Sequence, residues 1–260
     1  YVHNLYASLF EMSRSLQRTE LYEPDALSGE IQAALANSPM ELPATSLVAC
    51  PGVDGAYSAA AAEKLFPSGN FMFFDTFAGV FDAVENDLCQ YVMLPIENSI
   101  YGTVNEVYDL MRTHKFHIAR SVRLKINHVL LGKHGADMNN IKKIYSHPQA
   151  IGQCRAYLKT RKGVEVIPCA NTAIAAKMVS ENNDNSIAAI CSRNCASLYD
   201  LSVLAEDVQD NAINETRFIC ISKNLQILPG ASRISIMLSV AHKPGSLYML
   251  LANFAALGIN

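Results

Sequence analysis

The stretch from Leu47 to Phe66 (LVACPGVDGAYSAAAAEKLF) decides the fold class. It predicts a short apolar strand over residues 47–49, a glycine-containing turn, and an alanine-rich helix over residues 57–66. The apolar run 71–74 then predicts a second strand. A strand, a helix and a strand in this order form a βαβ unit, so the stretch indicates an α/β fold with a largely parallel sheet.

The same alternation continues for most of the chain. Further strands are predicted over residues 91–96, 122–131, 141–145, 164–167 and 187–190. Further helices are predicted over residues 76–86, 148–159 and 171–180, and another from Thr103, where Thr103-Val104-Asn105-Glu106 has the pattern of a capping box. This is more strands and helices than a single sheet normally accommodates. We therefore expect two lobes with a cleft between them.

The two ends of the chain follow different patterns. Leu5, Leu9, Met12 and Leu16 form one apolar stripe of a helix, which predicts that residues 1–37 are the end of a helical bundle and a linker helix. After a break at 228–230, residues 232–241 predict a strand, and the turn 244–247 opens a helix. We expect residues 232–260 to begin a small α+β unit and the chain to be a fragment of a longer polypeptide.

The composition of the chain limits the classes of function that are expected. Of the 260 residues, 50% are hydrophobic and 17% charged, which indicates a globular protein. With 21 basic against 24 acidic residues and no basic block, nucleic acid is not an expected partner. No apolar run has the length of a membrane span, and the first residues do not resemble a signal peptide, so we expect a cytoplasmic protein without a membrane partner.

Cysteine and histidine residues suggest no metal site. The 7 cysteines are odd in number and lie in apolar stretches, as buried thiols do in a reducing compartment. Cys191 and Cys195 are the one pair considered as metal ligands, and we favour free thiols. His114 and His117 are interpreted as residues of a solvated loop.

Polar turns follow four of the predicted strands. They are Glu97-Asn98-Ser99, Ser146-His147-Pro148-Gln149, Asn171-Thr172 and Ser192-Arg193-Asn194. Each turn alone is an ordinary helix cap. Together they predict a binding cleft for a small anion, because ligands of open α/β sheets bind outside the carboxyl ends of the strands, next to helix N-termini.

The segment from Asn214 to Phe218 (NETRF) adds chemistry to this cleft. It precedes the apolar run 219–221 and places a hydroxyl and a guanidinium side by side at the mouth of a predicted strand. The Thr216 hydroxyl can hydrogen-bond a leaving oxygen, and the Arg217 guanidinium can hold a carboxylate in a bidentate fork. No Walker lysine, dinucleotide loop or Gly-x-Ser-x-Gly elbow is present.

Five motifs, taken in order, resemble the prephenate dehydratase family. They are Gly52 to Ser58, Pro95 to Ser99 with Gly102, Ser146 to Ala150, Asn171 to Ala173, and Asn214 to Phe218. The resemblance covers residues 46–223 and implies a two-lobed fold like the type II periplasmic binding proteins. The first lobe is expected at about 46–122 and 198–223, and the second at about 123–197. The first motif departs from the family pattern, because it contains one extra residue and has Ala56 where a residue with a hydroxyl group is common.

The resemblance implies conversion of prephenate to phenylpyruvate, water and carbon dioxide, without a cofactor. Its expected catalytic residues are Thr216, Arg217 and Asn214. Its expected substrate-binding residues are Tyr57, Ser58, Glu97, Asn98, Ser99, His147, Gln149, Asn171, Thr172 and Phe218. The alternatives are an arogenate dehydratase and a non-catalytic two-lobed module that binds small anions.

The ends resemble two further modules of bifunctional chorismate mutase/prephenate dehydratases. Ser13 and Gln17 are similar to residues of the last helix of helical chorismate mutases. His242 to Tyr248 resembles the opening of an ACT regulatory domain, which implies that Pro244, Gly245, Ser246, Leu247 and Asn260 bind phenylalanine as an effector. A homodimer or homotetramer is expected.

Overall fold

The computed structural model describes residues 2, 5, 6, 9, 10, 13, 14, 17, 25–211 and 213–259. The chain divides into two compact units. One comprises residues 38–230, and the other comprises residues 1–37 together with 231–260. The first of these units contains both sheets and all of the predicted catalytic and substrate-binding residues.

The first sheet of the 38–230 unit has the strand order β2-β1-β3-β11-β5. Its strands are β1 (Leu47–Pro51), β2 (Asn70–Phe74), β3 (Tyr91–Asn98), β5 (His117–Lys125) and β11 (Glu215–Ser222), and the short β4 (Gly102–Thr103) pairs with β3. Strands β1, β2 and β3 are parallel, and β11 runs antiparallel to both of its neighbours. The βαβ pattern of residues 47–74 is therefore confirmed.

Helices cover both faces of this sheet because the strands bury side chains on both sides. Helix α3 (Tyr57–Leu65) packs on the face that includes Phe218 and Cys220. Helices α4 (Phe77–Glu85) and α5 (Asn105–His114) pack on the face that includes Ile219 and Ile221. Alternation along β11 thus assigns its even and odd residues to opposite faces.

The second sheet has the order β10-β6-β9-β7-β8. Its strands are β6 (Val129–Gly132), β7 (Lys143–Ser146), β8 (Glu165–Pro168), β9 (Ile187–Cys191) and β10 (Ser202–Ala205). The helical elements around it are η1 (Met138–Asn140), α6 (Pro148–Gln153), α7 (Arg155–Thr160), α8 (Thr172–Glu181) and α9 (Asn194–Leu198). Helices α8 and α9 contribute to one core cluster of this lobe, and the opposite cluster includes residues of α7.

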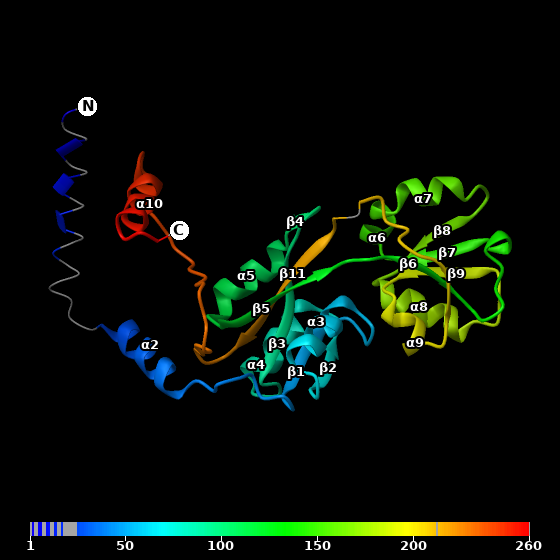
Figure 1. The fold of residues 1–260 in the computed structure, drawn as a ribbon, viewed down its shortest axis with the longest axis horizontal. Coiled ribbons are helices and arrows are strands. Elements are labelled where there is room, and N and C mark those ends of the chain that lie inside the picture. The colour runs from blue at the N-terminus through cyan, green and yellow to red at the C-terminus, as the bar shows by residue number, and fades with distance from the viewer. Residues whose placement is uncertain are drawn as a thin grey trace. The chain divides into compact units, whose positions relative to one another are not determined.

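The two sheets have the same topology. In each, parallel strands continue into one antiparallel strand, β11 in the first sheet and β6 in the second, and that strand is reached from the other lobe. Two segments, residues 126–128 and the described residues of 206–214 (206–211 and 213–214), make the crossings and lie side by side, with the Ile126 N–H donating to the Asn214 carbonyl at 2.7 Å (Figure 1). The fold is the expected two-lobed α/β domain of the type II periplasmic-binding-protein kind.

Several predicted boundaries are wrong. The strand predicted over 122–131 is two strands separated by the crossing segment 126–128. The helix predicted from Thr103 begins at Asn105, because residues 102–103 pair with β3, and its N-cap Val104 has no side-chain hydrogen bond. The helix predicted over 148–159 is broken at Cys154 into α6 and α7. Residues 202–205 belong to the second sheet, so the second lobe extends beyond residue 197.

The other unit is described by itself. Its described residues before 25 are helical, and α2 (Ala26–Asn37) and α10 (Ser246–Ala256) follow in sequence. Met12 and Leu16 of the predicted stripe lie outside the described residues, and Leu5 and Leu9 are exposed. The strand predicted over 232–241 is not formed. Among the described residues, no strand lies beside this segment and pairs with it. No helix among the described residues has the length and apolarity needed to span a membrane.

The inner strand β11, which lies between β3 and β5, yields a stability prediction. Ile219 is fully buried in the cluster beneath α4 and α5. We expect Ile219→Ala to lower the free energy of unfolding by about 2–5 kcal/mol, because it leaves a cavity in a packed core. Urea unfolding measures this change. The matched control is Ile213→Ala, since Ile213 is 80% exposed, and an equal loss in both variants would contradict the packing described.

Candidate active site

A buried polar cluster lies where β3 ends and β11 begins. The register pairs Thr216 with Asn98, and Asn214 precedes β11 in the second crossing segment. Asn98, Asn214 and Thr216 are all at most 7% exposed. Buried polar groups of this kind need hydrogen-bond partners, and the partners determine what each group can still offer to a ligand.

The Asn98 amide is held in one orientation. Its Oδ1 accepts the backbone N–H groups of Ile100 and Tyr101, each at 3.0 Å. Its Nδ2 therefore faces the other way and donates to Asn214 Oδ1 and to Thr216 Oγ1, each at 2.9 Å. Because backbone N–H groups only donate, this arrangement leaves no ambiguity about which end of the Asn98 amide is oxygen.

The orientation of Asn98 determines the polarity of its two partners. Thr216 Oγ1 accepts a hydrogen bond from Asn98, which leaves its O–H proton free to donate. Asn214 Oδ1 also accepts from Asn98, so its Nδ2 is a donor, and that buried Nδ2 has no hydrogen-bond partner among the residues that the structure describes. A hydroxyl donor and an amide donor are thus available for a ligand oxygen.

Two hydrogen bonds between Ser99 and Glu215 stabilise this cluster. The Glu215 N–H donates to Ser99 Oγ at 3.0 Å, and the Ser99 N–H donates to the Glu215 carbonyl at 2.8 Å. The Ser99 hydroxyl thereby fixes the first residue of β11 against the end of β3. Four of the predicted residues, Asn98, Ser99, Asn214 and Thr216, are brought together.

Arg217 does not join this cluster. Successive strand residues point to opposite faces, so Arg217 lies on the face of Ile219, whereas Thr216 lies on the face of Phe218. The expectation that the hydroxyl and the guanidinium lie side by side is therefore wrong. Arg217 is half-buried with Glu97 as a cross-strand neighbour, and within the described residues its guanidinium makes no hydrogen bond or ion pair. Phe218 is a core residue beneath α3.

Three helix N-termini carry the remaining predicted residues. Asn171 caps α8, with its Oδ1 accepting from the Ile174 N–H at 2.7 Å, and Thr172 is the first residue of that helix. His147 caps α6 through Nδ1, which accepts from the Gln149 N–H at 3.2 Å, and burial lowers the pKa of His147. Ser58 lies in the first turn of α3, whose N-cap Ala56 provides no side-chain hydrogen bond.

Contacts between the lobes bring these helix N-termini near the first lobe. The Tyr199 hydroxyl donates to the Asp54 carbonyl at 2.8 Å, and the Ser192 hydroxyl to the Gly55 carbonyl at 3.1 Å. Gly55 has a φ of +81°, and a Cβ there would lie 2.9 Å from the Leu198 side chain, so this approach requires glycine. Asn171 Nδ2 would lie 3.5 Å from a Cβ on Gly52.

Sequence reasoning missed Asn127 and His128 of the first crossing segment. His128 is 2% exposed, and its ring contacts the hydroxyl of Tyr57 and the amide of Gln153. The signal was present, because Asn127 and His128 are two consecutive polar residues and so break the alternation of apolar and polar residues that begins at Val122. The predicted residue Tyr57 therefore directs its hydroxyl to the crossing segment, and burial raises its pKa well above the ordinary value.

The predicted residues at the two ends belong to the other unit. Ser13 and Gln17 are helical and exposed. Gly245, with a φ of +86°, precedes Ser246 and Leu247 at the start of α10, which confirms the helix predicted after Pro244. Asn260 lies outside the described residues.

The thiols and one surface cluster are the remaining candidate metal ligands. All seven cysteines are free, and six of them are buried. Burial raises the pKa of Cys50 and Cys154 to about 12. On the surface of the first lobe, Asp82, Glu85 and His114 present ligand atoms within 4.8 Å of one another.

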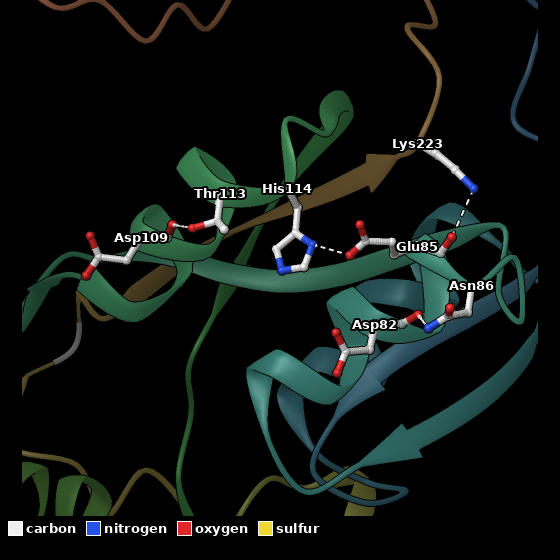
Figure 2. A network of polar contacts seen from close by, with 7 residues as sticks. All are labelled: Asp82, Glu85, Asn86, Asp109, Thr113, His114 and Lys223. Atoms are coloured by element: carbon white, nitrogen blue, oxygen red, sulfur yellow. Dashed lines mark hydrogen bonds and ion pairs between the residues drawn. The ribbon is translucent and has the colours of Figure 1, made fainter.

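His114 and His117 do not lie in a solvated loop. His114 is the last residue of α5, and its Nδ1 lies 2.6 Å from Glu85 Oε2 (Figure 2). Its ring packs against Phe81 and Phe116. His117 is the first residue of β5. The contact between His114 and Glu85 joins helices α4 and α5.

A family model described as prephenate dehydratase matches residues 48–226. The chain belongs to the prephenate dehydratase family. The matched region contains both lobes and the Asn98 cluster. Members of this family are dehydratases, which are lyases.

Individual relatives agree with this assignment. Arogenate dehydratase/prephenate dehydratase 2 of Arabidopsis thaliana is 40% identical over 82% of this chain and 56% of its own length. Arogenate dehydratase 2 of Petunia hybrida is 39% identical over 82% of this chain and 54% of its own length. The chain thus spans about half the length of these relatives. The structure of prephenate dehydratase from Arthrobacter aurescens, in complex with L-Phe, has a TM-score of 0.70 and 28% identity, covering 82% of this chain and 73% of that one.

The orientation of Asn98 yields a prediction. We expect Asn98→Asp to lower the free energy of unfolding by about 1–3 kcal/mol, because the carboxylate removes the donor to Asn214 and Thr216 and those two groups must turn to pair with it. Turnover should fall by about tenfold or more, since both donors lose their fixed orientation. Chemical unfolding and steady-state kinetics measure the two effects. Asn70→Asp, an exposed site with the same change of charge, is the control and should match the wild type.

Proposed function

We propose that this protein converts prephenate to phenylpyruvate, with loss of carbon dioxide and water. The proposal rests on two hydrogen-bond donors, the Thr216 hydroxyl and the Asn214 amide. Asn98 donates to the oxygen of each group and so leaves the O–H and N–H protons unpaired, in a chain that belongs to the prephenate dehydratase family. The reaction breaks the bond to the ring carboxylate and the bond to the 4-hydroxyl. One proton is taken up as hydroxide leaves as water, and the ring becomes aromatic.

The donors suit the departing hydroxyl. Its oxygen gains negative charge as the carbon–oxygen bond breaks, and a fixed donor stabilises that charge more in the transition state than in the substrate. The Thr216 O–H is oriented for this role because its oxygen is already occupied by Asn98. Threonine is a weak acid, so Thr216 acts as a hydrogen-bond donor or as a relay for the proton.

The two carboxylates of prephenate require other partners. We assign the side-chain carboxylate to the N-termini of α8 and α3, whose first N–H groups and dipoles favour anions. The Asn214 amide is a second donor within the same buried cluster as Thr216. Arg217 projects to the other face, so we assign it no contact with the substrate beside Thr216.

Arogenate is the alternative substrate. It differs from prephenate in carrying an amino group in place of the keto group, and the names of the plant relatives include both activities. Turnover of both compounds by the same preparation, followed by the appearance of the aromatic product, decides between them. Binding of either compound without turnover would indicate the non-catalytic module instead.

Thr216 yields the central prediction of this proposal. We expect Thr216→Val to lower kcat by about 100- to 1,000-fold with little change in KM, because it removes a donor used in the transition state. Steady-state kinetics with the preferred substrate measures both constants. Thr113→Val, at an exposed site of α5, is the isosteric control. An unchanged kcat in the Thr216 variant would remove this hydroxyl from the mechanism.

For the other unit, we propose phenylalanine binding at the turn 244–247. The support is the helix N-terminus at Gly245 and Ser246, together with the L-Phe complex of the Arthrobacter aurescens enzyme. Calorimetric titration of L-phenylalanine tests this, with Ser246→Pro as the variant that removes one N–H. The chorismate mutase relationship of Ser13 and Gln17, the homodimer or homotetramer and the cytoplasmic location are proposed on the family resemblance alone.

A further inference from the structure

A chain of hydrogen bonds passes through His128 from one lobe to the other. Tyr57 extends from α3 of the first lobe, and its hydroxyl lies 2.6 Å from the Asn127 carbonyl and 3.3 Å from His128 Nδ1. His128 Nε2 lies 2.7 Å from Oε1 of Gln153, the last residue of α6 in the second lobe. One imidazole thus bridges a helix of each lobe.

The backbone around His128 also joins the two crossing segments. The His128 N–H donates to Gln209 Oε1 at 2.9 Å, and the Val208 N–H donates to the His128 carbonyl at 3.0 Å. The Asp210 N–H in turn donates to the Gln153 carbonyl at 2.7 Å. Any rotation of one lobe against the other must pass through these segments, so His128 lies at the pivot.

Among the described residues, no charged group contacts the His128 ring to balance a proton on it. The groups facing it are Tyr57, Asn127, Gln153 and Gln209, all of them neutral. The nearby carboxylates are directed elsewhere, Asp207 to the Gln209 amide and Asp210 to the N–H groups of Arg155 and Ala156. Burial lowers the pKa of His128 below its ordinary value of 6.5, and the hydrogen bond with Gln153 offsets this only in part. A neutral imidazole donates through Nε2 to Gln153, and its Nδ1 lies beside the Tyr57 hydroxyl, whose single proton goes to the Asn127 carbonyl in the shorter contact.

We propose that His128 is a positioning residue: through Tyr57 and Gln153 it holds the two lobes together, and so keeps the second-lobe residues in place against the Thr216 donor. The bridge matters for catalysis because Thr216 belongs to the first lobe, whereas Asn171 and His147 cap helices of the second. The catalytic part of this inference rests on the proposed function. The bridge itself does not.

The bridge makes closure of the lobes dependent on pH. In an open arrangement water reaches the ring, which then titrates near the ordinary value of about 6.5. In the closed arrangement the ring binds a proton less tightly. As pH falls below about 6.5 the proton therefore favours the open arrangement, by at most a factor of ten per pH unit for one group.

Four variants test the proposal. His128→Gln keeps an amide that can both donate and accept, but it cannot become charged. His128→Ala removes the contacts of the ring with both lobes, and Tyr57→Phe removes the first-lobe hydroxyl, which contacts both the Asn127 carbonyl and the His128 ring. His134→Gln is the control, because His134 is an exposed histidine of the second lobe. Far-UV circular dichroism confirms that each variant is folded at each pH.

Activity gives the first readout. For the wild type we expect KM to rise by up to about tenfold per pH unit between pH 6.5 and 5.5, while kcat changes less. His128→Gln should have a KM within about fivefold of the wild type at pH 7.5 and should lose the rise at low pH. His128→Ala and Tyr57→Phe should raise KM at every pH. A rise retained in His128→Gln, or an unchanged KM in His128→Ala, would overturn the proposal.

Scattering gives a second readout that needs no substrate. The radius of gyration from small-angle X-ray scattering should increase in the wild type and in His134→Gln from pH 7.5 to 5.5, and should stay constant in His128→Gln. If this pattern holds but neither prephenate nor arogenate is turned over, the proposed function fails and the bridge stands. If turnover occurs and the radius is independent of pH in all variants, the bridge fails alone.

Discussion

The hydrogen bonds of the Asn98 side chain are the interaction on which the site depends. They join the end of β3 to the start of β11, a strand that returns from the other lobe. The register of β11 has to be held here, because a shift of one residue would turn Thr216 to the face of α4 and α5 and bring Arg217 under α3. The buried amide makes such a shift costly, since it would leave polar groups without partners. One asparagine therefore specifies both the register of β11 and the chemical polarity of its first residues.

The exchange of strands between lobes explains why this cluster lies where it does. Strand β11 enters the first sheet directly after the crossing segment 206–214, and β6 enters the second directly after 126–128. The first residues of β11 are thus the part of the first sheet nearest to the crossings, and Asn214 belongs to the crossing itself. Thr216 is held by a packed sheet, and α6 and α8, which carry His147 and Asn171 at their N-termini, belong to a lobe connected to it through two short segments.

Much of the architecture followed from the sequence, and the failures have identifiable causes. Period-2 and period-3.6 patterns revealed the alternation of strands and helices, and the N-cap Asn171 lies in a turn that was expected to cap a helix. The apolar run 122–131 concealed a crossing, since the residues on both sides of Asn127 and His128 are buried equally well in two different sheets. Residues 232–241 have a strand pattern, but a pattern alone does not supply the neighbouring strand that provides hydrogen bonds. The placement of Thr216 and Arg217 on opposite faces followed from strand periodicity and was overlooked because the motif was treated as a unit.

The loop after β3 connects the chemistry of the cluster to the approach of the lobes. Tyr101 donates its N–H to Asn98 Oδ1, which helps to fix the direction of the amide, and its hydroxyl donates to the Gln149 carbonyl of α6 at 3.3 Å. The contact requires a glycine at position 152, where a Cβ would lie 2.7 Å from the Tyr101 hydroxyl. The loop that holds Asn98 therefore also touches the second lobe. Tyr101 therefore links the residue that orients the Thr216 donor to the contact between the lobes, so both depend on the same loop.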